Sequence, residues 1–187
     1  MLYINDHLLD LDLSKALLQL SEQRREQALK YKYEMGQRTC AAAYLLLCQG
    51  LKAEYGITEK PLFEYGEHGK PAIVGHPEIH FNLSHCREAA LCVISDRPVG
   101  VDVETVRQLK DSLAEYTMND RELDEIRQAE NPALQFTRLW TMKEALLKLT
   151  GEGINNHLKD VLDNSDVTFN TIVAPDARYA YTVCRFK

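Results

Sequence analysis

The chain has 187 residues and a formal net charge of -6, with 45% hydrophobic and 27% charged residues. This length is sufficient for one large domain or for two small fused lobes, each with its own core. The acidic balance argues against a general nucleic-acid binder, because such proteins carry an extended basic surface.

The cysteines and the N-terminal segment indicate a cytoplasmic protein. There are five cysteines, an odd number, and no CxxC pair occurs, which is typical of reduced thiols rather than of a disulfide scaffold. The N-terminal segment MLYINDHLLDLDLS carries acidic residues and lacks the basic region and apolar run of a signal peptide. No apolar run is long enough to span a bilayer, so we expect no membrane partner.

The first half of the sequence predicts a short strand, two helices and then several strands. The first strand is expected at residues 1–5, a helix at Ser14 to Ala28, and a second helix at about 36–54. Gly56 would end the second helix as its C-cap. Strand-like segments follow on both sides of the Gly-rich turn in LFEYGEHGKPAI, and again in IHFNLSH and AALCVISD.

The second half has a similar order of elements without a sequence repeat. After a turn at 96–98, VGVDVE predicts a strand, 108–130 and 132–150 are expected to be helical, and the last 22 residues predict a hairpin turning at Ala174–Asp176. No Ser/Gly-rich linker separates the halves, so we expect them to pack together. The predicted fold class is therefore α+β, with two similar lobes packed as a pseudo-dimer, each a small antiparallel sheet with helices.

The motif GVDVE at 100–104 predicts half of a hard-cation site. Alternate side chains of a strand share one face, so Asp102 and Glu104 point one way while Val101 and Val103 point into the core. Mg²⁺ commonly takes one or two protein carboxylates and completes its shell with water and phosphate oxygens. Taken alone, such a strand is more often the edge of a sheet with an acidic face in solvent.

The helix expected at 132–150 leaves a narrow polar line. Apolar residues at helical spacing cover most of its circumference, and the line consists of Thr137, Thr141, Glu144 and Lys148. We therefore expect this line to face a cleft, where a carboxylate needs a metal or a cationic partner. The alternative for Glu144 and Lys148 is a surface ion pair at spacing i,i+4. Lys143 lies beside Glu144, next to the proposed metal.

Three further segments supply groups that can donate to phosphate oxygens. In FNLSHC, Ser84 and His85 bring a hydroxyl and an imidazole to a strand end, although an isolated histidine more often bonds a backbone carbonyl. Lys70 lies in the turn of GKP and is either a phosphate ligand or an exposed turn lysine. Arg38 and Arg24 either contact an anion or solvate the surface of their helices.

Read in order, these motifs resemble the 4′-phosphopantetheinyl transferase superfamily, and specifically its monomeric two-lobed type, represented by the surfactin-synthetase activator. The likeness runs from about residue 21 to about residue 160 and includes YGEHGKPAI, HFNLSHC, PVGVDVE and LWTMKEALLKLTGEGI. The segment QRTC at 37–40 is similar to part of the family's first lobe. The combination is highly specific, whereas GKP or DVE alone would be weak.

The resemblance implies a reaction and its partners. The phosphopantetheine group of coenzyme A, the co-substrate, would pass to a serine of an apo acyl or peptidyl carrier protein, with release of adenosine 3′,5′-bisphosphate. Mg²⁺ would be required, with Mn²⁺ as an alternative because both ions accept oxygen ligands. The lobe of residues 1–97 would contact the nucleotide, the lobe of residues 98–187 would carry the metal and catalytic residues, and the active site of this monomer would lie at their interface.

The same resemblance implies roles for individual residues. Asp102, Glu104 and Glu144 would ligate the metal, and Asp102, Glu144 and Lys148 would form the catalytic set. Lys148 would contact a phosphate and stabilise the leaving group. The implied coenzyme A ligands are Arg24, Arg38, Thr39, Lys70, Ser84, His85 and Lys143. Glu144, or a metal-bound water that it orients, is the candidate base for the serine proton.

Two other functions stay open at this point. One is a non-catalytic module that binds coenzyme A or a nucleotide, and the intact set of three carboxylates with Lys148 argues against it. The other is a metal-dependent hydrolase of nucleotide pyrophosphates, in which water replaces the serine as acceptor. A zinc site built from His76, His80, His85 and Cys86 is a further alternative, but the spacing matches no recognised ligand frame.

Overall fold

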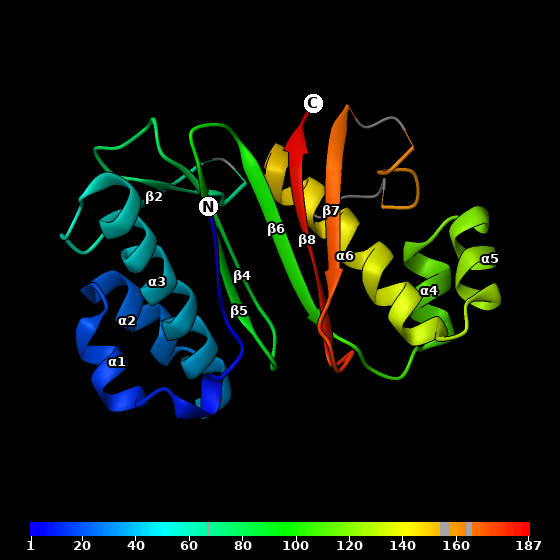
Figure 1. Cartoon of the computed structure of the whole chain (residues 1–187), viewed down its shortest axis with the longest axis horizontal. Helices are drawn as coiled ribbons and strands as arrows, with labels where there is room; N and C mark the ends of the chain where they lie inside the picture. Colours follow the sequence, from blue (N-terminus) through cyan, green and yellow to red (C-terminus); the bar gives the residue numbers. More distant parts are fainter. Residues whose placement is uncertain (67, 154–157, 164–165) are drawn as a thin grey trace.

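The computed structural model describes residues 1–66, 68–153, 158–163 and 166–187. In these residues two three-stranded antiparallel sheets lie side by side, with helices on their outer faces (Figure 1). The first sheet has the strand order β1-β5-β4, formed by Leu2–Asn5, Ala90–Ser95 and His80–His85. The second has the order β6-β8-β7, formed by Val99–Thr105, Tyr179–Phe186 and Val167–Val173. The predicted α+β class is confirmed.

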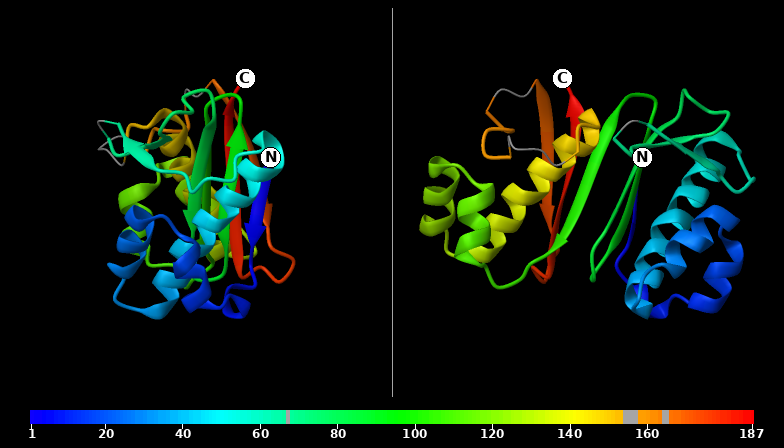
Figure 2. Two further views of the ribbon diagram at one scale, coloured as in Figure 1. Left: turned by 90° about the vertical axis from the view of Figure 1, so that its left-hand side faces the viewer. Right: turned by 180° about the vertical axis from the view of Figure 1, so that it is seen from behind.

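A long helix covers the outer face of each sheet. α3 (Glu34–Tyr55) packs on the first sheet and α6 (Pro132–Thr150) packs on the second, as the views from two sides show (Figures 1 and 2). The shorter elements of the first half are the 3₁₀ helix η1 (Leu8–Asp10), α1 (Leu13–Gln19), α2 (Glu22–Leu29) and the hairpin of β2 (Phe63–Tyr65) and β3 (Pro71–Ile73). Those of the second half are α4 (Asp111–Thr117) and α5 (Asp120–Gln128). No helix in the described ranges is both long enough and apolar enough to cross a membrane.

Several elements follow the sequence predictions closely. α6 has the predicted bounds of 132–150, and Gly56 ends α3 in the left-handed conformation at φ 70°. The C-terminal hairpin turns between Val173 and Tyr179, around the predicted turn. The two halves share one plan, a long helix on a small antiparallel sheet. The domain boundary between residues 97 and 98 stays a prediction.

The predicted helix from Ser14 to Ala28 is wrong in extent, because the segment forms two helices. Asp12, rather than Ser14, caps α1 by accepting a hydrogen bond from the backbone of Lys15. Ser21 then caps α2, its hydroxyl accepting from Arg24 N at 3.3 Å. A serine that takes this role offers the backbone an alternative to a continued helix.

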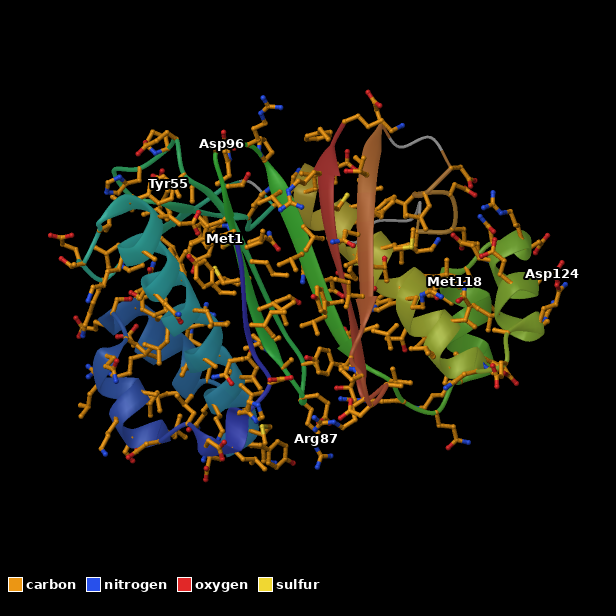
Figure 3. All side chains as sticks on the ribbon, viewed as in Figure 1. Met1, Tyr55, Arg87, Asp96, Met118 and Asp124 are labelled. Carbon is orange, nitrogen blue, oxygen red and sulfur yellow. The ribbon has the colours of Figure 1, made fainter. Side chains whose placement is uncertain are left out.

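The predicted helical segment at 108–130 is also interrupted. Asn119 and Glu122 form a reciprocal capping box, each side chain accepting a hydrogen bond from the other residue's backbone, and this starts α5 after α4 has ended. Met118 lies at the break, where Figure 3 labels it. It is completely buried and belongs to one core cluster with Ile126 and Leu139. The break therefore carries part of the core that holds α4 and α5 to α6.

β5 is buried on both faces, which explains its unbroken apolar run. One set of its side chains, Ala90, Cys92 and Ile94, packs in the core beneath α3. The alternate residues Leu91 and Val93 pack in a second core that is shared with the other sheet. The two halves are therefore joined through an apolar interior.

β6 closes this shared core from the other side. Val101 and Val103 are buried in it, as the alternation in GVDVE predicted. The opposite face of β6 meets α6, and the point of contact is Gly100. A Cβ at this position would overlap the carbonyl oxygen of Ala145 and lie 2.7 Å from Leu149 N. The helix backbone thus rests directly on the strand, in a space that no side chain can share.

We expect Gly100→Ala to lower the free energy of unfolding by about 3 kcal/mol, the upper part of the range for an overpacked core. The added methyl has helix backbone on its far side, so α6 must move away from β6. Urea unfolding of the full chain measures the change. Gly66→Ala is the matched control, because a Cβ added at Gly66 would lie 3.8 Å from Lys70 O, an ordinary van der Waals distance. Equal stability of the two variants would contradict the tight packing.

Candidate functional site

A cavity of about 450 Å³ lies between the two halves. Its walls come from the β2–β3 hairpin, α2 and β4 on one side and from α6 on the other. Five of the residues predicted to form the site line it: Arg24, Lys70, His85, Glu144 and Lys148. The structure therefore brings together residues that are up to 124 positions apart in the sequence, from Arg24 to Lys148.

Three predicted residues from three different elements meet beside this cavity. Lys148 of α6 donates to Asp102 Oδ1 of β6 at 2.6 Å and to the Ser84 hydroxyl of β4 at 3.0 Å. Ser84 in turn donates to the same Asp102 oxygen at 2.9 Å. Asp102 and Ser84 are buried, whereas the Lys148 side chain is 30% exposed. The lysine thus reaches a buried carboxylate from the cavity side.

The carboxylates around Asp102 are short of positive charge. Asp102 Oδ2 is buried and has no hydrogen-bond partner among the described residues, an arrangement that is costly for a charged group. Burial, followed by the charge of Asp102, raises the pKa of Glu104 to about 7. The same two causes raise the pKa of Glu144, and Lys148 offsets them only in part. These three side chains repel one another, so a cation would be favoured here.

The predicted metal set is not preassembled. Within the residues that the structure describes, no three His, Cys, Asp or Glu side chains stand in an arrangement that could hold a metal ion. The bare oxygen of Asp102 and the raised pKa values of its two neighbours nevertheless fit a divalent cation with oxygen ligands. Asp102, Glu104 and Glu144 as metal ligands stay a prediction.

A second group of residues around the cavity is short of negative charge. Arg24 Nε is buried without a hydrogen-bond partner in the described part of the chain. Lys70 donates to Leu149 O at 2.7 Å, and burial lowers its pKa. Burial, and then the charges of Arg24 and Lys148, lower the pKa of His85 to about 4. His85 is therefore a neutral imidazole at pH 7, able to donate one N–H bond.

Arg38 and Thr39 are placed away from this cavity. The Arg38 guanidinium donates to the carbonyl oxygen of Leu11 and to the Glu34 carboxylate, and it lines a separate hollow beside the start of α1. Thr39 is buried and donates to Gly36 O at 3.1 Å. Both side chains thus fix the N-terminal end of α3, and their contact with coenzyme A stays a prediction.

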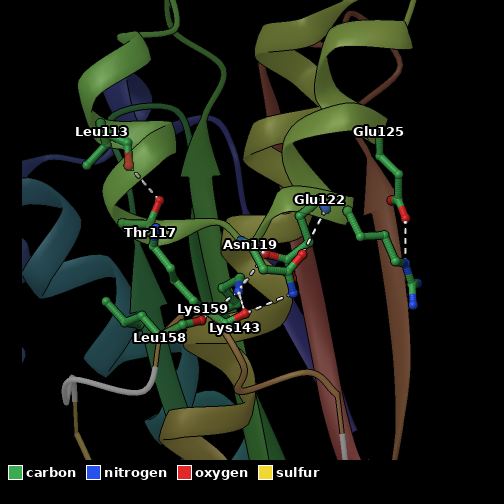
Figure 4. A network of polar contacts seen from close by, with 9 residues as sticks. Leu113, Thr117, Asn119, Glu122, Glu125, Lys143, Leu158 and Lys159 are labelled. Atoms are coloured by element: carbon green, nitrogen blue, oxygen red, sulfur yellow. Dashed lines mark hydrogen bonds and ion pairs between the residues drawn. The ribbon is translucent and has the colours of Figure 1, made fainter.

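Lys143 also points away from the cavity, although its neighbour Glu144 lines it. One step along a helix rotates the side chain by about 100°, and Lys143 turns into the core between α6 and α5 (Figure 4). Its ammonium is fully buried, 2.8 Å from the Glu122 carboxylate, and donates to Leu158 O at 2.6 Å and to Lys159 O at 3.2 Å. It cross-links the C-terminal half, and its predicted role as a coenzyme A ligand is not supported.

Sequence reasoning missed Asn82 and Tyr65, which also line the cavity. Asn82 is buried, and its Oδ1 accepts from Val101 N at 3.2 Å. The signal was available, because Asn82 lies two residues before Ser84 and therefore shares its face of β4. Tyr65 precedes the Gly-rich turn, where no spacing rule distinguishes a lining aromatic from a strand residue.

Replacing Lys143 should destabilise the chain strongly. Lys143→Met leaves a buried carboxylate and two buried carbonyls without their donor, so we expect a loss of about 3–5 kcal/mol in the free energy of unfolding. Lys143→Met combined with Glu122→Gln should recover at least half of this loss, because no unpaired charge then remains. The amide introduced at position 122 can still accept the hydrogen bond from Asn119 N that caps α5. Urea titrations of both variants measure the effect, and a loss below about 1 kcal/mol in the single variant would refute the cross-link.

The raised pKa of Glu104 predicts how stability depends on pH. A carboxyl group that binds its proton more tightly when folded than when unfolded loses stability as pH rises from about 4.5 to about 7. In the metal-free protein, Glu104→Gln should therefore raise the free energy of unfolding at pH 8 by about 1–2 kcal/mol, with allowance for partial exposure, and leave it nearly unchanged at pH 4.5.

Urea unfolding in the presence of EDTA measures this difference at the two pH values. Glu115→Gln, at an exposed carboxylate of α4, is the control. A benefit from Glu104→Gln that is equal at both pH values, or absent at pH 8, would show that the pKa of Glu104 is not raised in the folded protein.

Comparison with known proteins agrees with this geometry. Residues 98–184 match the 4′-phosphopantetheinyl transferase superfamily. The chain is 31% identical over 139 residues to the 4′-phosphopantetheinyl transferase psf-1 of Bacillus pumilus, covering 73% of this chain and 60% of that protein. It is 31% identical over 141 residues to a 4′-phosphopantetheinyl transferase of Bacillus subtilis, covering 73% and 62%.

A shorter likeness extends beyond Bacillus. The chain is 39% identical over 100 residues to the 4′-phosphopantetheinyl transferase HetI of Nostoc sp., covering 49% of this chain and 42% of that protein. The chain spans about 60% of the length of the two Bacillus relatives. On these matches, residues 98–184 belong to the 4′-phosphopantetheinyl transferase superfamily, and the chain is similar to named 4′-phosphopantetheinyl transferases over 73% of its length.

Proposed function

We propose that the protein transfers the 4′-phosphopantetheine group of coenzyme A to a serine of an apo acyl or peptidyl carrier protein, in a Mg²⁺-dependent reaction. Adenosine 3′,5′-bisphosphate is the other product. One observation carries the proposal: a buried oxygen of Asp102 beside the cavity and a buried N–H of Arg24 in the cavity wall both lack a hydrogen-bond partner among the described residues. A pyrophosphate with its metal ion supplies a partner for both groups.

The three carboxylates at and beside the cavity would hold the metal. Asp102, Glu104 and Glu144 would be its ligands, since Asp102 Oδ2 is buried and free to accept and the other two side chains are destabilised as anions. When bound, Mg²⁺ neutralises charge on the pyrophosphate and on the departing phosphate. Mn²⁺ could replace it, because it accepts the same oxygen ligands.

The cationic groups would bind and orient coenzyme A. Arg24 has a buried N–H to donate, Lys70 lines the same cavity, and His85 adds one N–H donor as a neutral imidazole. Lys148 stands between Asp102 and the open cavity, so its ammonium can move from the carboxylate to a phosphate oxygen without crossing the protein. Transfer of this kind depends mainly on positioning and on neutralising charge.

Glu144 is the candidate base for the incoming serine. A serine hydroxyl is a poor nucleophile until its proton is taken, and Glu144 lines the cavity without a hydrogen bond to another described residue. Burial raises its pKa, which makes the carboxylate a stronger proton acceptor than one in open water. Glu144, directly or through a water molecule, would accept the serine proton.

The carrier would approach from the second half of the molecule. Glu104 also lines a second hollow of about 340 Å³, together with Arg107, Lys110, Leu113 and Trp140. Two cations beside an apolar floor suit the acidic surface that the family implies for carrier proteins. Both walls of the catalytic cavity come from one chain, so a cytoplasmic monomer would be sufficient.

Incubation with coenzyme A, Mg²⁺ and a panel of apo carrier proteins tests the proposal. We expect a carrier to gain the mass of one phosphopantetheine group, as read by intact-protein mass spectrometry, and to gain none when EDTA replaces the metal. Glu144→Gln should slow the gain at least about a hundredfold, as expected for a lost general base, while the chain stays folded and no less stable than the wild type.

The matched control is Glu130→Gln, at an exposed carboxylate just before α6, which should keep full activity. Preserved activity in Glu144→Gln would remove Glu144 from the mechanism. Cleavage of coenzyme A without labelling of any carrier would instead indicate a pyrophosphate hydrolase, and binding of coenzyme A without either product would indicate a binding module.

A further inference from the structure

We propose that Tyr31 is a positioning residue for His85, and that its ring holds the imidazole in the orientation in which it donates to coenzyme A. This inference rests on the proposed function, because it assigns Tyr31 a task in binding the same co-substrate. His85 lines the cavity, whereas Tyr31 packs against His85 from outside the cavity lining. The effect of Tyr31 on the ligand therefore passes through the imidazole.

The rings of Tyr31 and His85 pack edge to face. Their centroids are 5.9 Å apart and their planes meet at 71°, a geometry that aromatic pairs prefer. His85 is the last residue of β4, and the torsion that turns an imidazole about its Cβ–Cγ bond has broad minima. A ring at the end of a strand therefore needs a neighbour to fix its direction, and the Tyr31 ring occupies that place.

Tyr31 is itself held by three contacts in the connection between α2 and α3. Its N–H donates to Ala28 O at 3.2 Å, and its carbonyl accepts from Gln37 Nε2 at 3.0 Å. Its ring lies against Gly36, where an added Cβ would come within 2.7 Å of the Tyr31 Cδ1 and 2.9 Å of its Cγ. These atoms are at the base of the side chain, so the ring could yield only by changing its rotamer or its backbone. Gly36 is thus the surface on which the Tyr31 ring rests.

The same contact helps to keep the imidazole neutral. Burial is the largest cause of the lowered pKa of His85, about 4, and the charges of Arg24 and Lys148 add to it. The charge of Asp102 acts in the opposite direction. Tyr31 supplies part of the burial, because its ring covers one side of the imidazole. Loss of this ring would let water reach His85, which favours the protonated form and raises the pKa.

Two measurements on the full chain test this role without turnover. NMR titration gives the pKa of His85, whose signals are identified by their absence in His85→Ala. Calorimetry with Mg²⁺ and no carrier protein gives the dissociation constant for coenzyme A. Tyr31→Leu keeps apolar bulk without a ring and should raise the pKa of His85 from about 4 to above about 5. It should also raise the dissociation constant about three- to tenfold, the range of one aromatic pair.

Tyr31→Phe keeps the ring and should restore both values. Gly36→Ala displaces the ring without changing either aromatic residue and should reproduce both effects of Tyr31→Leu. Tyr33→Leu is the matched control, at a side chain two residues away that is 72% exposed, and both values should stay at the wild-type level. Urea unfolding checks that each variant is folded. Tyr31→Met, with a side chain that adapts its shape, replaces Tyr31→Leu if that variant does not fold.

A double-mutant cycle tests whether Tyr31 acts through His85. His85→Ala should raise the dissociation constant for coenzyme A, and the addition of Tyr31→Leu should change it further by less than about twofold, because the group that Tyr31 orients is already absent. In the transfer assay, Tyr31→Leu should raise KM for coenzyme A and leave kcat within about twofold. This is the pattern of a contact that is equally strong in the bound substrate and in the transition state.

The outcomes distinguish this inference from the proposed function. An unchanged pKa of His85 in Tyr31→Leu would overturn the positioning role. A full further loss of affinity in the double variant would overturn it in favour of a direct contact between Tyr31 and the ligand. Equal effects in Tyr33→Leu would reduce it to a general structural role, and a wild-type protein that binds no coenzyme A would also overturn it. If no carrier protein gains mass while the pKa and the affinity change as stated, the transferase proposal fails and the role of Tyr31 stands.

Discussion

The contact of α6 with β6 at Gly100 is the constraint on which the rest of the site depends. Because position 100 has no side chain, the helix backbone at Ala145 and Leu149 lies directly on the strand. Residues on the same face of β6 then follow at intervals of two, which brings Asp102 and Glu104 beside α6. On the helix, Glu144 and Lys148 directly precede the two contact residues and lie one turn apart. Backbone packing thus places Asp102 and Glu104 of β6 near Glu144 and Lys148 of α6. This placement does not depend on attraction or repulsion between the charges.

The joint between the two halves combines an apolar core with a few polar bonds, and the two parts have different effects. Leu91 and Val93 of β5 pack with the valines of β6, and burial of this kind stabilises the joint without fixing its register closely. The bonds from Asn82 and Ser84 to the β6 backbone, and from Lys70 to the end of α6, are directional and supply the register. The cavity lies between these bonds, so its two walls are held at a fixed offset.

Local pattern was sufficient to predict much of the fold and the acidic part of the site. Period-two alternation identified the face of Asp102, and the apolar arc of 132–150 indicated that Glu144 and Lys148 face a cavity. The directions of other side chains could not be predicted in this way. Lys143 differs from Glu144 by one position, and its direction is set by the partner Glu122, which tertiary packing brings to it. Arg38 is similarly bound to the carbonyl of Leu11 in a loop whose path the sequence does not reveal. Prediction fails where a side chain's partner comes from a distant segment.

The pKa values of the carboxyl groups at the site are raised and that of His85 is lowered. This difference bears on how a cation and an anion would bind together. Glu104 and Glu144 are disfavoured as anions, and His85 is disfavoured as a cation. A cation bound alone relieves the carboxylates but adds positive charge near Lys148 and Arg24, which already lower the pKa of His85. An anion bound alone relieves that wall but faces the unpaired oxygen of Asp102. If each ligand relieves an interaction that the other would meet, linkage requires each to raise the affinity for the other by the same factor. Such a site would favour a cation and an anion bound together over either ligand alone.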